Sequence, residues 1–408
     1  MNEIDRRMFL TRAAGGMAAM ALVPNLQAFG GLSAEDALRV GVIGVGRQGR
    51  EIMGELGKIP GVSVVAVCDV DERRLASGLR RASGATGYST VREMLDSGGV
   101  NAVVVATPTH THREVAVECL KSGLHAYLEC PLAHTREDCI AISDAARSSK
   151  GVVAAGLQGR SNPVYQLARG FFLSDSVRDL VSMRAQNNRK TNWITPSNDP
   201  VRKEALNWKL DPKRSNGLAG EWGTQQFDVF HWYTGKYPTR VTGHGGIRFY
   251  EDGRKVHDTI SCTLVYEDGA TLGYDATLAN SYGGKHEVFF GSNAAIKLGW
   301  SHGWLFKESD APTQGWEVYA NRQQFHNDEG ITLIAGATKL AEQGKLKEGI
   351  GLPNPAVHYA LVDWVTAIAS GGSVACSVDE AARATMVGIA ANDAIVSGKS
   401  VDIDLSGL

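Results

Sequence analysis

Residues 38–49, LRVGVIGVGRQG, decide the fold. The run Leu38–Ile43 is apolar and typical of a buried strand, and it leads directly into a G-x-G-x-x-G made by Gly44, Gly46 and Gly49. In such a turn the first glycine permits a sharp bend, the second lets the backbone approach a pyrophosphate, and the third lets the next helix pack closely on the strand. This order of strand, glycine turn and helix predicts a dinucleotide-binding domain.

The helix after the turn supplies the rest of the expected cofactor site. Arg47 and Gln48 lie at its start, where free N–H groups and the positive end of the helix dipole favour phosphate. Asp69 ends a second apolar strand, twenty residues beyond the last glycine, where an acid meets the ribose 2′-OH. Because this carboxylate would repel a 2′-phosphate, the sequence predicts NAD, although Arg73 and Arg74 weaken the preference over NADP.

Strands and helices continue to alternate after this unit. Apolar strands are expected at Asn101–Ala106, Leu124–Leu128 and Val152–Ala155, with helices between them. The alternation predicts an α/β fold with a doubly wound parallel sheet, whose ligands bind at the carboxyl ends of the strands. Two polar groups follow strands at that edge, and both are expected near the cofactor: Thr107, Pro108 and His112 after one strand, Glu129 and Cys130 after the next.

Composition narrows the class of protein. At 408 residues the chain is long for one core, which predicts two domains. A net charge of −2 without a basic stripe argues against nucleic acid as a partner, and past residue 30 no apolar run is long enough for a membrane anchor. No metal site is expected, because no cysteines form a C-x-x-C pair and His110 and His112, two apart, do not share a helix face.

The N-terminus carries an export signal by its pattern. Arg6 and Arg7 precede the apolar stretch Ala13–Pro24, which has the length of a signal h-region and lacks the polar face of an amphipathic helix. We expect a twin-arginine signal peptide over residues 1–30 and a mature protein in the periplasm or outside the cell. Proteins on this route are exported folded, so an NAD enzyme would hold its cofactor tightly and recycle it within one active site.

Taken together, these motifs resemble the Gfo/Idh/MocA family of glucose–fructose oxidoreductase and inositol dehydrogenase. The family pattern combines the glycine fingerprint with T-P-x-x-x-H, E-K-P and D-x-G-x-H-x-x-D. Here the last two read ECP at 129–131 and EWGTQQFD at 221–228. The resemblance implies a Rossmann domain over 31–156, a substrate and oligomerisation domain over 157–355 with a large open, mainly antiparallel sheet, and helices over 356–408 that pack back. It also implies a homo-oligomer formed through that sheet.

The departures from the family pattern fall on the catalytic groups. The resemblance puts a lysine where this chain has Cys130 and a histidine where it has Gln225, and in a sugar dehydrogenase these two handle the hydroxyl proton. Glu221 is the titratable residue left on that motif, one helical turn before Gln225. It is expected either to act as general acid/base, with a pKa raised by burial, or to cap or salt-bridge the helix that starts near Trp222.

The remaining candidate residues each have two interpretations. Gln225 either binds a substrate hydroxyl or lies on a polar helix face, and Trp193, in the polar stretch Gln186–Trp208, is either a sugar platform or part of a surface loop. Four more are expected at the cofactor or substrate, and a fifth is a weaker proton-handling candidate: Gln158, Arg160, Asp228, His231 and then Tyr282.

The sequence therefore predicts an exported NAD-dependent enzyme acting on a sugar, glycoside or cyclitol. One alternative is a redox-neutral NAD-dependent glycosidase or lyase, in which oxidation, elimination and reduction follow one another on the same cofactor. The other is a sugar-binding protein that retains NAD without catalysis.

Overall fold

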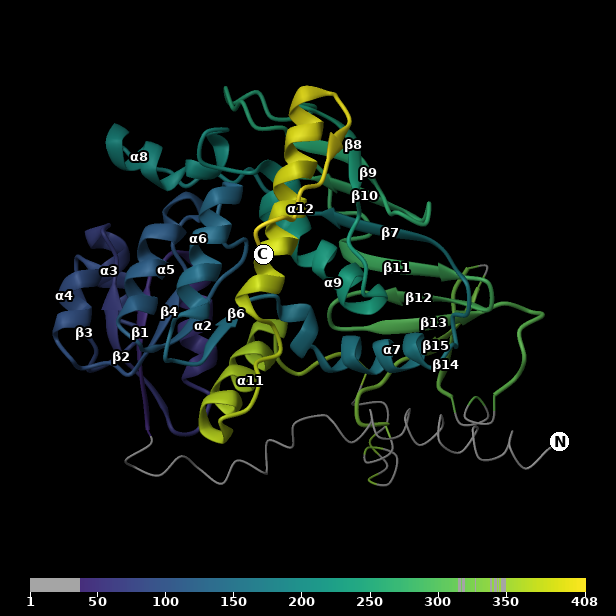
Figure 1. Ribbon diagram of the computed structural model, residues 1–408, viewed down its shortest axis with the longest axis horizontal. Coiled ribbons are helices and arrows are strands. Elements are labelled where there is room, and N and C mark those ends of the chain that lie inside the picture. The colour runs from purple at the N-terminus through teal and green to yellow at the C-terminus, as the bar shows by residue number, and fades with distance from the viewer. Residues whose placement is uncertain are drawn as a thin grey trace.

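The computed structural model describes residues 37–408 with gaps at 315–316, 318–319, 327, 338–339, 341–342, 344 and 346–349. Two sheets lie side by side, and two long C-terminal helices run between them (Figure 1). The expected signal peptide, residues 1–30, lies outside the described residues. In the described part no helix is long and apolar enough to cross a membrane.

The N-terminal sheet has the predicted doubly wound arrangement. Its strands are all parallel in the order β3-β2-β1-β4-β5-β6. The chain adds β2 and β3 on one side of β1 and then returns to add β4, β5 and β6 on the other side. Helices alternate with strands, and the apolar strand residues expected from the sequence are buried. The elements are β1 (Leu38–Ile43), α2 (Arg47–Leu56), β2 (Val62–Cys68), α3 (Glu72–Leu79), β3 (Thr86–Tyr88), α4 (Val91–Asp96), β4 (Ala102–Val105), η2 (Thr109–Thr111), α5 (His112–Lys121), β5 (His125–Leu128), α6 (Arg136–Arg147) and β6 (Val153–Ala155).

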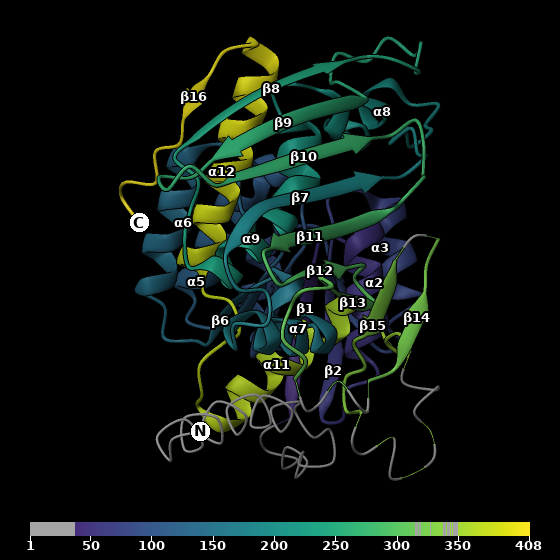
Figure 2. The same ribbon diagram turned by 90° about the vertical axis from the view of Figure 1, so that its right-hand side faces the viewer.

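The second sheet is large and mainly antiparallel. It has ten strands in the order β14-β15-β13-β12-β11-β7-β10-β9-β8-β16, and β7 with β10 forms a parallel pair. Helices pack on one face of this sheet. The opposite face is uncovered and is turned toward the viewer in Figure 2. The strands are β7 (Leu180–Asn188), β8 (Arg240–Gly246), β9 (Thr259–Val265), β10 (Thr271–Thr277), β11 (Lys285–Gly291), β12 (Ala294–Leu298), β13 (Gly303–Lys307), β14 (Arg322–Gln324), β15 (Glu329–Thr332) and β16 (Val401–Asp402).

Short helical segments join the two sheets and approach the site. They are η3 (Gln158–Ser161), α7 (Pro163–Leu173), α8 (Pro200–Leu206), η4 (Trp208–Leu210), η5 (Ala219–Gly223), which is a π-helical turn, and α9 (Thr224–Thr234). The interpretation of Gln186–Trp208 as a surface loop was wrong in part, because β7 extends into this stretch and α8 lies within it. Asp199 caps α8 and Pro200 is its first residue, which is a recognisable helix start.

The C-terminal helices pack on both domains. On α11 (Ala356–Ser370), Leu361 and Trp364 are buried in the same apolar cluster as Val40 and Ile52 of the first domain. The next helix, α12 (Val378–Ser397), contacts α6 of the first domain and α9 and β8 of the second. Helix α12 therefore packs on both domains, and α11 packs on the first domain and on η3 at the junction.

Candidate functional site

The glycine turn after β1 is sterically specified. Gly44 has a φ of +85°, and a Cβ on it would lie 2.6 Å from the carbonyl oxygen of Ala106. A Cβ on Gly49 would lie 2.0 Å from the carbonyl oxygen of Gly44. At Gly46 the nearest atom to a Cβ would be a guanidinium nitrogen of Arg74 at 3.6 Å, so the turn is open on that side. Two positions are closed by packing and the middle one leaves room for a ligand.

The N-terminus of α2 fits a pyrophosphate. Side chains accept N–H groups at the starts of α3, α4 and α6, whereas α2 begins after Gly46, with Arg47 and Gln48 first, and has no side-chain cap. Thr107 Oγ1, at the end of β4, is buried without a hydrogen-bond partner among the described residues, while Pro108 leads on to η2. Uncapped N–H groups and an unpartnered hydroxyl are what a bound dinucleotide would satisfy.

Asp69 packs against the glycine turn from the end of β2. Its carboxylate accepts hydrogen bonds from the backbone N–H groups of Val45 (2.9 Å) and Asp71 (2.8 Å). Burial raises its pKa, and these two bonds oppose that shift. Asp71 in turn binds Arg202 of α8 at 2.5 Å, so a residue of the second domain reaches the expected ribose position.

The loop after β5 is held by His112. Its Nδ1 lies 3.1 Å from the carbonyl oxygens of both Pro131 and Leu132. Burial lowers the pKa of this imidazole, and backbone contacts with Pro131, Val105 and Leu132 oppose the shift, so the ring also meets the end of β4. The loop that it holds contains a cis Cys130–Pro131 peptide bond. The two loops at the sheet edge are thus joined through this imidazole.

Glu129 and Cys130 form the edge of the cofactor site nearest the second domain. Glu129 Oε1 accepts a hydrogen bond from Gln48 Nε2 at 3.3 Å, and burial raises the pKa of this carboxyl to about 7. Cys130 is half-buried, and burial raises the pKa of its thiol well above the ordinary range. The thiol therefore stays neutral and supplies no charge to the site.

Gln225 binds the strand-to-helix bridge between the domains. Its Nε2 donates to the carbonyl oxygen of Gly156 at 2.7 Å, and its Oε1 accepts from the backbone N–H of Gln158 at 3.2 Å. Both ends of the amide are engaged by backbone, so the side chain fixes the position of residues 156–158. A direct bond from Gln225 to substrate remains a prediction, as does cofactor contact by Gln158.

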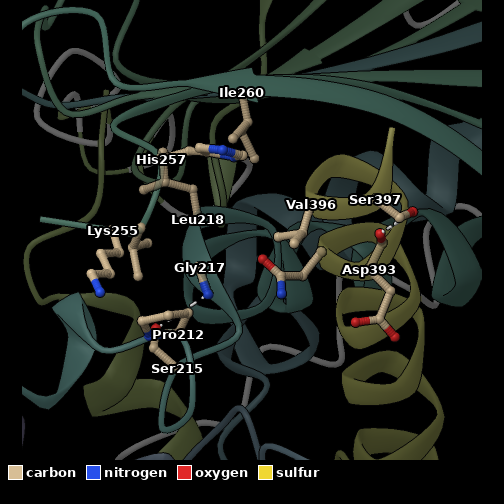
Figure 3. Close-up of a pocket in the computed structure, with 12 residues that line it drawn as sticks. Pro212, Ser215, Gly217, Leu218, Lys255, His257, Ile260, Asp393, Val396 and Ser397 are labelled. Carbon is tan, nitrogen blue, oxygen red and sulfur yellow. Dashed lines mark hydrogen bonds between the residues drawn. The ribbon is translucent and has the colours of Figure 1, made fainter. Parts of the chain in front are cut away.

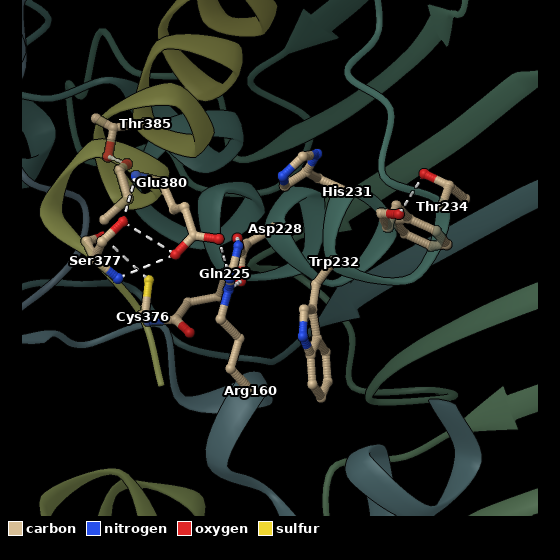
Figure 4. Close-up of polar contacts among 12 residues, drawn as sticks. Arg160, Gln225, Asp228, His231, Trp232, Thr234, Cys376, Ser377, Glu380 and Thr385 are labelled. Atoms are coloured by element: carbon tan, nitrogen blue, oxygen red, sulfur yellow. Dashed lines mark hydrogen bonds and ion pairs between the residues drawn. The ribbon is translucent and has the colours of Figure 1, made fainter. Parts of the chain in front are cut away.

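Arg160 and Asp228, predicted separately at the substrate, bind each other (Figure 4). The guanidinium makes two bonds to the Asp228 carboxylate, of 2.9 and 2.7 Å, and a third to Glu380 of α12. Arg160 is 5% exposed and Asp228 1%. His231, one turn further along α9, stacks on Tyr237 with ring centroids 3.6 Å apart. The hydrogen bonds of this group join η3, α9 and α12, and they engage most of its charged atoms.

Glu221 lies where the two domains meet. It sits on the π-helical turn η5, and its Oε2 accepts a hydrogen bond of 3.3 Å from Thr109 on η2 of the first domain. The same oxygen lies 3.7 Å from Lys209 Nζ. Its side chain is 2% exposed, and burial raises the pKa while Lys209 and Thr109 oppose the shift. A buried carboxyl beside one cation and one hydroxyl has surroundings that suit proton transfer.

Aromatic residues surround this point, and the sequence predicted some of them. Trp193 meets Trp222 edge to face, with centroids 5.4 Å apart, and is part of the apolar packing of the second domain. Trp208 lies 5.6 Å from the ring of His110. Tyr282 is instead on an exposed turn, 87% accessible, and its hydrogen bonds are made by its backbone carbonyl and N–H groups. Proton transfer by its phenol stays a prediction.

The sequence analysis missed a buried polar group behind α9. Glu287 of β11 is fully buried and accepts hydrogen bonds from Tyr165 (2.5 Å), Gln226 (2.7 Å) and Trp300 (3.2 Å). Lys285 Nζ lies 3.3 Å from the centroid of the Trp300 ring, and burial lowers the pKa of this amine. Alternation along Lys285–Gly291 puts Lys285 and Glu287 on one face, but nothing in the sequence indicates their partners.

A cavity of about 500 Å³ opens in the second domain beside α12 (Figure 3). It lies between the end of α12 and residues 212–218, and its lining includes Lys255, His257 and Asp393. None of the predicted site residues lines it. Within the described ranges no group of three or more His, Cys, Asp or Glu side chains could hold a metal ion.

Comparisons with known proteins agree with this architecture. Residues 38–157 match a family described as "Oxidoreductase family, NAD-binding Rossmann fold", and residues 182–297 match the GFO/IDH/MocA C-terminal domain. Inositol 2-dehydrogenase 1 of Saccharopolyspora erythraea is 28% identical over 251 residues, 60% of this chain and 69% of that protein. A glycosyl hydrolase family 109 protein of Shewanella putrefaciens is 32% identical over 177 residues, 37% of this chain and 38% of its own length.

Among solved structures, levoglucosan dehydrogenase in complex with NADH and levoglucosan superposes with a TM-score of 0.72 at 20% identity. The match covers 90% of this chain and 99% of that one. The two matched domains together span more than half of the sequence. The cofactor is NAD, and the chain belongs to the Gfo/Idh/MocA family of NAD-dependent oxidoreductases.

Proposed function

We propose that the protein oxidises a hydroxyl group of a sugar, glycoside or cyclitol with NAD held between its two domains. One observation carries the proposal: Glu221 is a buried carboxyl that touches the cofactor domain through Thr109. NAD supplies an acceptor for the carbon-bound hydrogen and its electron pair. The protein must then take the hydroxyl proton, and Glu221 is placed for it.

Other residues set the surroundings of this step. Gln225 holds residues 156–158 through two hydrogen bonds and does not titrate. Trp193 and Trp222 offer apolar faces of the kind that pack on sugar rings. Glu129, joined to Gln48 of the cofactor turn, holds the opposite edge of the site. The names of the relatives, an inositol dehydrogenase and a levoglucosan dehydrogenase, support a polyhydroxylated substrate.

The test uses the purified protein with its cofactor. Native mass spectrometry first measures bound NAD, and absorbance at NADH wavelengths is then followed while myo-inositol, levoglucosan, glucose and simple glycosides are added singly. We expect the bound cofactor to be reduced by at least one of them. Absence of NAD binding on titration, or of reduction by every compound, would contradict oxidation of a sugar hydroxyl.

A redox-neutral glycosidase is the second candidate. Two points favour it: Cys130 and Gln225 stand where the family resemblance implies a lysine and a histidine, and the chain is similar to a glycosyl hydrolase family 109 protein. In this route a sugar carbinol would pass its hydride to bound NAD, and the carbon acid beside the new carbonyl would lose a proton as the aglycone leaves. Water would then add to the resulting double bond, and the hydride would return to the carbonyl, which leaves no net redox change. Nitrophenyl glycosides distinguish the two: nitrophenol release without net NADH supports the glycosidase, and neither signal leaves a non-catalytic sugar-binding protein.

We also propose export with the cofactor already bound. The support is the pattern of Arg6, Arg7 and Ala13–Pro24, which lies outside the described residues. Replacing both arginines by lysine keeps the charge but removes the twin-arginine signature, so the precursor should remain in the cytoplasm. Fractionation of cells with an antibody against the protein measures this, and normal export of the variant would refute the assignment.

For assembly, we propose that the uncovered face of the ten-stranded sheet joins copies of the chain. In Figure 2 the described helices lie behind this sheet. Val181 and Phe290 are exposed apolar residues on its strands β7 and β11. Replacing both with Lys should lower the subunit number seen in native mass spectra, whereas an unchanged oligomer would place the interface elsewhere.

A further inference from the structure

A lysine from the second domain reaches the buried carboxyl of Glu221. Lys209, on the short helical turn η4, places Nζ 3.7 Å from Glu221 Oε2. The same oxygen accepts the hydrogen bond from Thr109 Oγ1. Among the described residues, Lys209 is the only Lys or Arg whose nitrogen lies within 4.0 Å of this carboxylate. The neighbouring turns η4 and η5 of the second domain thus meet η2 of the first domain at one oxygen atom.

Aromatic rings hold the lysine in this position. Its Nζ lies 5.3 Å from the ring centroids of both Trp193 and Trp208, which is within the range of cation–π attraction. Trp193 packs on Trp222, the residue after Glu221, and Trp208 packs on His110, the residue after Thr109. The rings that flank the ammonium therefore rest on neighbours of its two polar partners. Lys209 is 35% exposed, so it is held at the edge of the site rather than extended into solvent.

We propose that Lys209 is the positioning residue of the catalytic centre and supplies from the second domain the positive charge that is absent at Cys130. The proposal rests on the proposed function, in which Glu221 takes the hydroxyl proton. In that step the substrate carbon gives up its hydrogen with the electron pair to the oxidised nicotinamide, the O–H proton goes to Glu221, and a C=O bond forms. A carboxyl accepts that proton only when ionised, and the adjacent ammonium favours the ionised form.

The other charged groups around this cluster do not replace Lys209. Arg214 is paired with Glu204 at 2.8 Å and with Asp211 at 3.4 Å, both outside the Glu221 contact. His110 faces Trp208, and burial and Arg214 lower its pKa, which keeps the ring neutral near pH 7. Burial raises the pKa of Glu221, and the charge that opposes this shift comes from Lys209, helped by hydrogen bonds from the hydroxyl of Thr109 and the backbone of Asn216.

Kinetics as a function of pH test the proposal on the NAD-loaded full-length protein. Lys209→Met removes the charge and keeps much of the side-chain length, Lys209→Arg restores the charge, and Lys213→Met is a matched control on the same segment. We expect Lys209→Met to move the acidic limb of kcat/KM upward by about one pH unit or more, the scale of a neighbouring opposite charge. Lys209→Arg should move it back, and Lys213→Met should match the wild type. An acidic limb that Lys209→Met leaves unmoved overturns the proposal.

A second measurement does not depend on turnover. The ¹³C carboxyl resonance of Glu221, identified by its loss in Glu221→Gln, is titrated by NMR in the wild type and in Lys209→Met. The midpoint should rise in the variant, and an unchanged midpoint overturns the proposal even if no substrate is found. If the midpoint rises but no sugar reduces the bound cofactor, the proposed function fails and the Lys209–Glu221 pairing stands.

Discussion

The two edges of the candidate site are built in different ways. On the first domain the glycine turn, Asp69 and the start of α2 come from about thirty consecutive residues. On the second, Glu221 takes its partners Thr109 and Lys209 from elements 112 and 12 residues away along the chain. Local sequence determines the cofactor edge, whereas tertiary packing assembles the catalytic edge. Substitutions at the cofactor edge should thus act on cofactor binding and folding, and substitutions at the catalytic edge should act on turnover.

The largest effect is expected at Gly49. Its Cβ in Gly49→Ala would lie 2.0 Å from a backbone carbonyl oxygen, so the turn must open. We expect a loss of about 4 kcal/mol or more in the free energy of unfolding, the range of exceptional mutations, together with loss of NAD binding. Gly54, on the same helix, has no atom within 4 Å of its Cβ position. Gly54→Ala should instead stabilise the protein by up to about 1 kcal/mol.

Chemical denaturation and NAD titration of the two glycine variants measure this difference. Equal effects would show that α2 tolerates a side chain at both positions and that the cofactor edge is not determined by its local backbone.

Breaking the Arg160–Asp228 pair is expected to cost slightly less. Asp228→Asn leaves a guanidinium buried with one carboxylate partner in place of two, and removal of one member of a buried pair costs about 3–5 kcal/mol. Glu380→Gln is the control, because its side chain is 32% exposed and water can replace the lost charge. Urea denaturation should give a larger loss of unfolding free energy for Asp228→Asn than for Glu380→Gln. The reverse result would mean that α12, not α9, anchors Arg160.

Replacing Glu221 should affect catalysis without cofactor loss. Glu221→Gln keeps the size and the bond from Thr109 but cannot titrate, so turnover should fall by roughly 10²-fold, the usual scale of general acid–base catalysis. NAD affinity, measured by calorimetry, should be unchanged because the contacts of the glycine turn lie on the other domain. Unchanged turnover on an identified substrate would make Glu221 structural and return His231 and Tyr282 to consideration.

The smallest expected effect is a pH dependence of stability at Glu129. Burial raises the pKa of this carboxyl from its ordinary 4.5 to about 7. A raised pKa in the folded state means that folding binds protons, so this group's contribution is fully present below pH 4.5 and is lost as the pH rises through 7. Glu129→Gln should remove a decline on the order of 2 kcal/mol between these values. Cofactor-free protein is used, and parallel pH profiles of stability in wild type and variant would contradict the shift.

Much of the fold could be predicted from the sequence because it depends on local patterns. Apolar runs alternate with helices in the first domain, and the helices expected over 356–408 are α11 and α12. Strand β7 was missed because its polar outward residues, among them Arg184 and Gln186, merge with the polar loop that follows. Parallel pairing of β7 with β10 depends on tertiary packing, which no local pattern reports.

Residues of the site could be predicted only where they belong to a recognisable sequence motif. Glu221, Arg160 and Asp228 were each singled out, but their partners Lys209 and Glu380 were not, since neither stands in a recognisable pattern. Contacts between residues so far apart in the chain are determined by how η4 and α12 pack. The residue types at the site could therefore be predicted, and their pairing could not.

The Arg202–Asp71 contact has a consequence for exchange with the surroundings. It is an ion pair of 2.5 Å between α8 and the start of α3, and both side chains retain partial contact with solvent, at 22% and 14%. Attraction between partly solvated charges weakens as ionic strength rises. The contact between α8 and the start of α3 should thus have a shorter lifetime in concentrated salt. A molecule bound between the two domains would then be released sooner.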